Sequence, residues 1–401
     1  MELVVALLYF FREAFGNVTI KGVFLSGNAD LFYFLSLYYF FFYFFKKETS
    51  KNKKQIFLWI VPLIIYAMIQ IVFLGGVSIP KMVINIGKIV LCIGVMYLTI
   101  NKASKFNIKK FLVYISLMYA ASIPLALIFR NTFIWRHGDV VNKYSLSRLQ
   151  LFYMEPSELG FHLAIIIIIL LAMVLYEKNI KHRNIFIGAI IVNLMVLAMA
   201  RPWGSIVTLL ASIVFMVGVY VILNPSKKSF RIAGVFLIGI ILVVGFSAAA
   251  KNSLYMRAVD TIQGKDLSNW YRVNTSVRLT NMMFNDTSGL GVGFGNLNTD
   301  LVRENYTVWG LVSVIPNSIL YEIAETGILG IIGIWGLFTA LMYKCFKDKS
   351  LIKWGLLSFI FLYQVFGGHF TNPLNWMIYG FIFSSFNDEK ALSYNTLIKG
   401  E

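Results

Sequence analysis

The stretch VLAMARPWGSIVTLL, residues 196–210, decides how the chain folds. It lies within 40 residues, Asn184 to Leu223, in which Arg201 is the only charged side chain. A single helix of that length would be about 60 Å long, roughly twice the thickness of the hydrocarbon core of a bilayer. We therefore predict two membrane-spanning helices with a hinge at Arg201–Gly204, because proline and glycine interrupt helices and tryptophan favours the membrane interface. Placing a charged arginine side chain at the membrane costs free energy, so we expect Arg201 to have a functional or structural role.

The composition is typical of a polytopic membrane protein. Of the 401 residues, 58% are hydrophobic and only 14% are charged. Several apolar runs are long enough to cross a bilayer as helices. We therefore predict an all-α fold with eleven or twelve spans, near residues 3–15, 30–45, 55–74, 81–100, 111–129, 159–176, 184–200, 204–223, 231–250, 316–343, 352–368 and 372–386.

Basic residues predict the orientation of these spans. All five strongly basic connections fall on one side, which the positive-inside rule makes cytoplasmic. They carry 5, 4, 3, 3 and 4 Lys or Arg, at residues 46–54, 101–110, 176–183, 225–231 and 344–353. The net charge of +17 then reflects loops that face anionic membrane lipid, and we do not expect binding to nucleic acid.

This orientation divides the chain into five parts. Arg201 and two longer loops fall on the outer side, so we expect an outer-face loop domain. The parts are N-terminal transmembrane helices at 1–130, an outer loop with the start of a re-entering helix at 131–158, central transmembrane helices at 159–250, a large extracytoplasmic loop at 251–315, and C-terminal transmembrane helices with a cytoplasmic tail at 316–401.

Arginine is concentrated on the predicted outer side, whereas lysine dominates inside. The rigid guanidinium fork binds phosphate and carboxylate in a bidentate manner, so this bias favours an anionic ligand outside. The alternative is surface arginines paired with outer acids such as Asp260, Asp286, Asp300 and Glu304. Nine of the eleven arginines fall outside: Arg12, Arg130, Arg136, Arg148, Arg201, Arg257, Arg272, Arg278 and Arg303.

The segment EPSEL, residues 155–159, enters a span from the outer side. Pro156 suits the first turn of a helix, and so does Glu158. Glu155 and Glu158 are three residues apart and can share a face. Either can be a general base near Arg148, or both can simply belong to a well-capped helix start.

Glycines alternate in SGLGVGFGNLN, residues 288–298. Alternate glycines permit backbone bends and close approach of a ligand or another strand, but no nucleotide-binding unit surrounds them. In the following span, Glu322 and Glu325 lie on the outer half, where an acid is expensive unless it is paired. We expect them to pair with arginines such as Arg201 or Arg278, either in a site or as buried ion pairs that fix helix packing.

The four histidines do not have the spacing of a metal site, and the sequence predicts neither a bound metal nor a cofactor. His162 lies one turn inside a span, where packing is the usual role. His369, in the outer turn GGHFTNP, is a candidate for the site. The absence of a P-loop excludes ATP as the energy source.

Several motifs together resemble the O-antigen ligase and polymerase superfamily. They are EPSELG (155–160), ARPWGSIVTLLAS (200–212), SVRLTNMMF (276–284), GLGVGFGN (289–296) and NSILYEIAETGILGII (317–332), in the family's order across roughly residues 148–340. The resemblance implies a GT-C-like helical fold and a lipid-linked glycan substrate on the outer leaflet of a bacterial plasma membrane. It also implies glycosyl transfer without a nucleotide sugar or a metal.

One position departs from the family's ligases. They usually carry His-Asn-Ser where this chain has Pro316-Asn317-Ser318, and proline cannot accept a proton. This favours a polymerase that joins undecaprenyl-diphosphate-linked repeat units of an O-antigen, capsule or exopolysaccharide. Its partners would be that lipid-linked oligosaccharide, membrane lipids, and companion proteins such as a chain-length regulator and a flippase.

The expected roles follow from this hypothesis. Positioned arginines stabilise the charge that develops on the leaving diphosphate, and a carboxylate deprotonates the acceptor hydroxyl. We assign the diphosphate to Arg201 with Arg278 as its helper, the base to Glu155 or Glu158, and substrate binding to Arg148, Arg272, Asn317 and His369. Two alternatives remain: an O-antigen ligase that transfers glycan to lipid A core, and a flippase for lipid-linked oligosaccharide.

Overall fold

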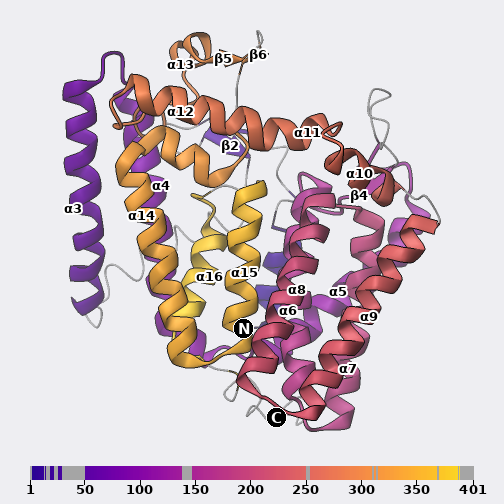
Figure 1. Ribbon diagram of the computed structural model, residues 1–401. Coiled ribbons are helices and arrows are strands. Elements are labelled where there is room, and N and C mark those ends of the chain that lie inside the picture. Colours follow the sequence, from indigo (N-terminus) through magenta and orange to yellow (C-terminus); the bar gives the residue numbers. More distant parts are fainter. Residues whose placement is uncertain are drawn as a thin grey trace.

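The structure is a computed structural model, and helices dominate it (Figure 1). It describes residues 2–12, 14, 19–21, 26–28, 50–137, 147–249, 253–308, 311–312, 315–367, 370–386 and 388. The predicted span at 30–45 lies outside the described residues, as does His369.

The bundle helices match the predicted spans closely. They are α3 (Ser50–Phe73), α4 (Ile79–Lys102), α5 (Ile108–Ile128), α6 (Pro156–Tyr176), α7 (Ile180–Ala200), α8 (Trp203–Leu223), α9 (Lys227–Ala249), α14 (Ser318–Asp348), α15 (Leu351–Phe366) and α16 (Pro373–Phe383). The first predicted span, 3–15, is a helix of only 9 residues, α1 (Glu2–Phe10). At 1.5 Å per residue this helix is too short to cross a bilayer.

Six helices are long and apolar enough to cross a membrane within the described part of the chain. They are α4 with its short 3₁₀ extension η2 (Ala103–Lys105), α5, α6, α7, α8 and α14. Two shorter apolar helical segments, Leu58–Phe73 and Leu351–Phe366, accompany them. The protein is therefore a multi-pass membrane protein.

The remaining elements are small, and several lie across one end of the bundle (Figure 1). The helices among them are α10 (Ser253–Ile262), α11 (Leu267–Trp270), η3 (Tyr271–Thr275), α12 (Ser276–Asp286) and α13 (Asp300–Asn305). The described residues also form three antiparallel pairs of short strands: β1 (Thr19–Lys21) with β2 (Ser26–Asn28), β3 (Trp135–Arg136) with β4 (Arg148–Leu149), and β5 (Thr307–Val308) with β6 (Leu311–Val312).

Helix α6 is the centre of the bundle. Its most apolar window is 83% buried, whereas those of the other candidate spans are 33–44% buried. Its sequence is apolar all round, including five consecutive isoleucines at 165–169, which is typical of a helix enclosed by other helices. Helices α7, α8 and α15 pack against it.

The hinge predicted from the sequence is confirmed, with one correction. Helix α7 ends at Ala200, Arg201 has left-handed backbone angles (φ 47°, ψ 47°), and Pro202 is the N-cap of α8. Gly204 does not break the helix, because it lies inside the first turn of α8. Pro202 packs on the start of α6, where a Cβ on Gly160 would approach its ring to 2.2 Å.

Helix α14 is interrupted at Gly327, whose backbone angles (φ 55°, ψ −130°) are accessible only to glycine. The break removes helical partners from the carbonyls of the preceding turn. The glycine-rich segment predicted to make a close approach replaces them: the Val292 N–H donates to Ala324 O at 2.9 Å and the Gly293 N–H to Glu325 O at 3.0 Å.

The same glycine-rich segment also provides hydrogen-bond partners for backbone groups on the other side of the break. The N–H of Ile328 donates to Gly289 O at 2.9 Å, and the Gln70 side chain of α3 donates to Leu290 O (2.7 Å) and Glu325 O (2.9 Å). All four alternating glycines have positive φ. We call the unit formed by residues 289–297 and the α14 break the glycine clasp.

The side chain of Glu325 closes this clasp. It is fully buried and accepts hydrogen bonds from Asn85 Nδ2 (2.6 Å), the Gly295 N–H (2.8 Å) and the Leu297 N–H (3.3 Å). The expectation that Glu325 pairs with an arginine is therefore wrong. Two backbone amides and the Asn85 side chain compensate the carboxylate instead.

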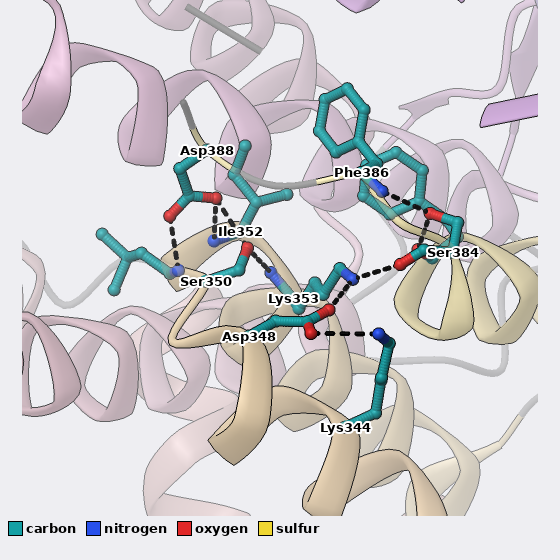
Figure 2. A network of polar contacts seen from close by, with 10 residues as sticks. Lys344, Asp348, Ser350, Ile352, Lys353, Ser384, Phe386 and Asp388 are labelled. Carbon is teal, nitrogen blue, oxygen red and sulfur yellow. Dashed lines mark hydrogen bonds and ion pairs between the residues drawn. The ribbon is translucent and has the colours of Figure 1, made fainter. Parts of the chain in front are cut away.

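A polar network fixes the opposite end of the bundle (Figure 2). Lys353, fully buried at the start of α15, donates to Asp348 at the end of α14 and to Ser384 O at 2.7 Å. Asp388 accepts from Ser350 Oγ at 2.6 Å, next to the first turn of α15. These contacts tie the α14–α15 turn to the chain that follows α16.

A second ion pair at this end joins α5 to the end of α6. Lys109 Nζ lies 3.1 Å from Glu177 Oε2, and both side chains are nearly buried. Burial raises the pKa of Glu177, but the Asn179 N–H and Lys109 outweigh it, so this pKa lies below its usual value. The pair therefore contributes stability above the unfolded-state pKa of glutamate, about 4.3, and loses it as pH falls through the folded-state pKa.

We expect Gly327→Ala to destabilise the fold strongly, because a Cβ there would lie 2.0 Å from Gly289 O in a backbone conformation that alanine avoids. The strain alone is about 1–3 kcal/mol. Gly333→Ala, in the same helix with open space at its Cβ, is the matched control and should be neutral or slightly stabilising. Thermal unfolding in detergent measures both; equal melting temperatures would contradict the role of the clasp.

We expect Glu177→Gln to lower the free energy of unfolding by about 1 kcal/mol or more near pH 7, because it removes a charged acceptor from Lys109. The difference from wild type should shrink towards pH 4. Thermal unfolding measured as a function of pH tests this, with Glu304→Gln, an exposed acid at the end of α13, as the control. A difference that stays constant with pH would rule out the ionic contribution.

Candidate functional site

A large cavity of about 1920 Å³ opens at one end of the bundle. Its wall combines the starts of α4, α6, α8, α14 and α16 with the end of α15, the β3–β4 pair, α10 and α11. The lysine-rich connections α4–α5, α6–α7, α8–α9 and α14–α15 lie at the other end. The cavity is therefore on the side that the sequence predicts to be extracytoplasmic.

Basic side chains outnumber acidic ones in the cavity wall. The basic residues are Arg12, Lys81, Lys88, Arg136, Arg148, Arg257 and Arg272, and the acids are Glu155, Glu158, Asp266 and Glu322. A cleft lined mainly by one sign of charge, with walls of low dielectric, concentrates counter-ions. The cavity is suited to a large anionic ligand.

Two of the arginines are neutralised by acids within the wall. Arg257 Nε lies 3.0 Å from Asp266, which is almost buried and also caps α11. Arg136 lies 3.3 Å from Glu155, and both of these side chains are about half exposed. These pairs leave other cations for a ligand.

Arg272 is the best-placed arginine for an anion. It belongs to η3, a π-helical turn in which the Ser276 N–H reaches back five residues to Tyr271 O. Its Nη1 donates to Phe366 O, near the end of α15, at 2.6 Å. This bond holds the guanidinium at the cavity wall, and among the described residues it uses only one of the five donors of Arg272.

Arg148 is the second arginine of the wall that is well placed to bind an anion. It lies on β4, half-buried, and its side chain makes no hydrogen bond or ion pair with the residues that the structure describes. Burial, together with the nearby Arg136 and Arg257, lowers its pKa from the usual value. Arginine titrates so high that it stays charged. An anion between these guanidiniums would relieve their mutual repulsion.

The structure brings four of the sequence-predicted site residues together: Glu155, Glu158, Arg148 and Arg272 all line the cavity. The prediction that Pro156 opens α6 is confirmed, with Glu155 as N-cap. The Glu155 carboxylate does not cap the helix. It accepts from Ser157 Oγ at 2.9 Å and faces Arg136.

Arg201 and Arg278 are absent from the described cavity lining. Arg201 is half-buried beside it, because the left-handed turn that ends α7 places Pro202 and Trp203 in the wall instead. Arg278 is on the exposed side of α12, whose opposite face buries Leu279 and Met283. The structure therefore does not bring these two arginines together at the cavity.

Asn317 has a structural position, and His369 is not described. Asn317 caps α14 by accepting from the Leu320 N–H at 3.0 Å, and it donates to Val365 O at 2.6 Å. It is 5% exposed and outside the described cavity lining, whereas its neighbours Pro316 and Ser318 belong to that lining.

Seven charged residues of the wall received no site role from the sequence: Arg12, Lys81, Lys88, Arg136, Arg257, Asp266 and Glu322. Arg12, Lys88 and Glu322 each interrupt a mostly apolar segment, and that signal could have identified these three. Arg12 is 2% exposed and contacts His162 Nε2 (3.2 Å) and Asn372 Oδ1 (3.1 Å), so it also ties the end of α1 to α6 and α16.

Aromatic side chains complete the wall. Phe133, Trp135, Trp203, Tyr363 and Phe370 line it. The indole N–H of Trp135 is already bound to Ala126 O at 2.9 Å, so this ring offers mainly its apolar surface. Flat aromatic faces beside cations suit a ligand that carries both sugar rings and anionic groups.

No family model and no curated protein matches this chain. Within the described part of the chain, no three His, Cys, Asp or Glu side chains lie close enough to hold a metal ion.

We expect the cavity to bind inorganic pyrophosphate, and Arg272→Ala or Arg148→Ala to weaken that binding. A hydrogen bond between charged groups contributes about 1.5–3 kcal/mol, so Kd should rise roughly tenfold or more. Isothermal titration calorimetry on the detergent-solubilised protein measures this. Arg130→Ala, exposed and outside the described lining, is the control. If Arg278→Ala weakens binding as much as Arg272→Ala does, the anion site lies elsewhere.

Proposed function

We propose that this protein is a glycosyltransferase that polymerises undecaprenyl-diphosphate-linked oligosaccharide repeat units at the outer face of a bacterial plasma membrane. The observation that carries the proposal is the cavity: cations, carboxylates and aromatic rings share one large space at the end of a membrane-spanning bundle away from the lysine-rich connections. A lipid-linked glycan presents sugar rings and a diphosphate together, and each finds complementary groups there.

In the proposed reaction an acceptor hydroxyl of one repeat unit attacks the anomeric carbon of another. The bond from that carbon to the diphosphate oxygen breaks, and negative charge develops on the leaving diphosphate. Fixed cations stabilise that charge most effectively in a site shielded from water. A single displacement inverts the configuration of the anomeric carbon.

The positions of the arginine side chains indicate which of them would contact the diphosphate. Arg272 and Arg148 are the proposed contacts of the diphosphate, since both line the cavity and have guanidinium donors that no described residue engages. Arg201 shapes the wall through Pro202 and Trp203. Pro316 also lines the cavity, so the position where related ligases carry a histidine offers no proton acceptor here. This favours a polymerase over a ligase.

Purified protein supplied with undecaprenyl-diphosphate-linked repeat units should produce a ladder of lengthened glycans that EDTA does not abolish. Arg272→Ala should slow ladder formation by a factor of about 10²–10³, because one charge-stabilising donor is lost. Arg130→Ala should not slow it. Electrophoresis of the released glycans measures the rate. Folded wild-type protein that moves the lipid-linked repeats across a vesicle membrane without joining them would instead establish a flippase.

Arg201→Ala separates the two roles considered for Arg201. Loss of the ladder at unchanged thermal stability would place the side chain in the site. An unchanged ladder would restrict Arg201 to ending α7.

A further inference from the structure

Two glutamates one helical turn apart in α14 have opposite environments. Glu325 is enclosed by the glycine clasp and accepts three hydrogen bonds. Glu322 is 4% exposed and lines the cavity, yet its carboxylate makes no hydrogen bond or ion pair with any residue that the structure describes. Removing a carboxylate from water without a partner is costly, so a fold that keeps one at a cavity wall preserves it for another purpose.

The hydroxyl of Ser318, close to Glu322 in the sequence, also lacks a hydrogen-bond partner among the described residues. Ser318 lies four residues before Glu322 and therefore on the same face of α14. It is 2% exposed and lines the cavity, and its Oγ has no hydrogen-bond partner among the described residues. A hydroxyl and a carboxylate that both lack protein partners form a strip that can bind a ligand with hydroxyl groups.

The two glutamates at the start of α6, Glu155 and Glu158, are less suited to accept a proton. Glu155 is 57% exposed and already interacts with Arg136 and Ser157. Glu158 is in the first turn of α6 and has interactions of its own. Glu322, in contrast, has both carboxylate oxygens unengaged by described residues.

We propose that Glu322 is the general base of the site and that Ser318 helps to bind the acceptor sugar. This inference rests on the proposed polymerase function. The acceptor O–H gives its proton to the Glu322 carboxylate while its oxygen forms the bond to the anomeric carbon. The bond from that carbon to the diphosphate oxygen breaks, and its electron pair leaves with undecaprenyl diphosphate beside Arg272 and Arg148. Glu322 then releases the proton to water in the cavity.

The test compares Glu322→Gln with Glu325→Gln in the polymerisation assay, with thermal unfolding and pyrophosphate binding measured in parallel. Glu322→Gln should slow ladder formation by a factor of about 10²–10⁴, while its melting temperature does not fall and its Kd for pyrophosphate stays within about twofold. Glu325→Gln should lower the melting temperature. In Glu322→Ala, added sodium formate should restore part of the rate, because a small carboxylate can enter the vacated space.

The outcomes are distinct. A wild-type protein that forms no ladder removes the proposed function and this inference with it. An active wild type with an equally active Glu322→Gln leaves the function standing and excludes Glu322 as the base. The same exclusion follows if Glu322→Gln also loses stability or pyrophosphate binding, or if formate has no effect on Glu322→Ala. Loss of activity in Glu158→Gln with retention in Glu322→Gln would move the base to the start of α6.

Discussion

The architecture depends on the sealing of a broken membrane helix. Backbone groups released inside a membrane protein must find partners within the protein, since no water is available to them in the hydrocarbon core. The break at Gly327 frees the carbonyls of Ala324 and Glu325, and residues 289–293 take them up as a neighbouring strand would. The large loop before α14 is thereby fixed against two membrane helices, because Gln70 of α3 joins the same contact.

The clasp also determines the shape of the cavity. Beyond the break, Gly295 and Asn298 of the same segment belong to the cavity wall, as do Ser318, Tyr321 and Glu322 on the outer part of α14. Lys81 of α4 reaches across to Asn298 O at 2.8 Å. Residues 295–298 therefore lie between α4 and α14 and contact both helices, while the Asn85 side chain of α4 also donates directly to Glu325 of α14 at 2.6 Å. These contacts help to form the wall of the cavity of about 1920 Å³.

The sequence predicted the ends of helices far better than the directions of side chains. Pro202 and Pro156 mark their helix starts through local sterics, which operate whatever the rest of the chain does. Arg201 and Arg278 were predicted from their places in sequence motifs, whereas the directions of their side chains depend on a left-handed turn and on the rotation of α12. Two of the three partners of Glu325 are backbone amides, which carry no signature in the sequence. The unpartnered state of Glu322 becomes visible only once its surroundings are known.

The π-helical turn at Tyr271–Thr275 has a consequence for how such a site can change. In an uninterrupted α-helix Arg272 would precede Ser276 by one turn and share the face that buries Leu279 and Met283 against the neighbouring core. The extra residue of the turn rotates Arg272 away from that face and towards the cavity. Gain or loss of a single residue there would redirect a charge with no change in amino-acid identity, so the evolution of this site can proceed through insertions as readily as through substitutions.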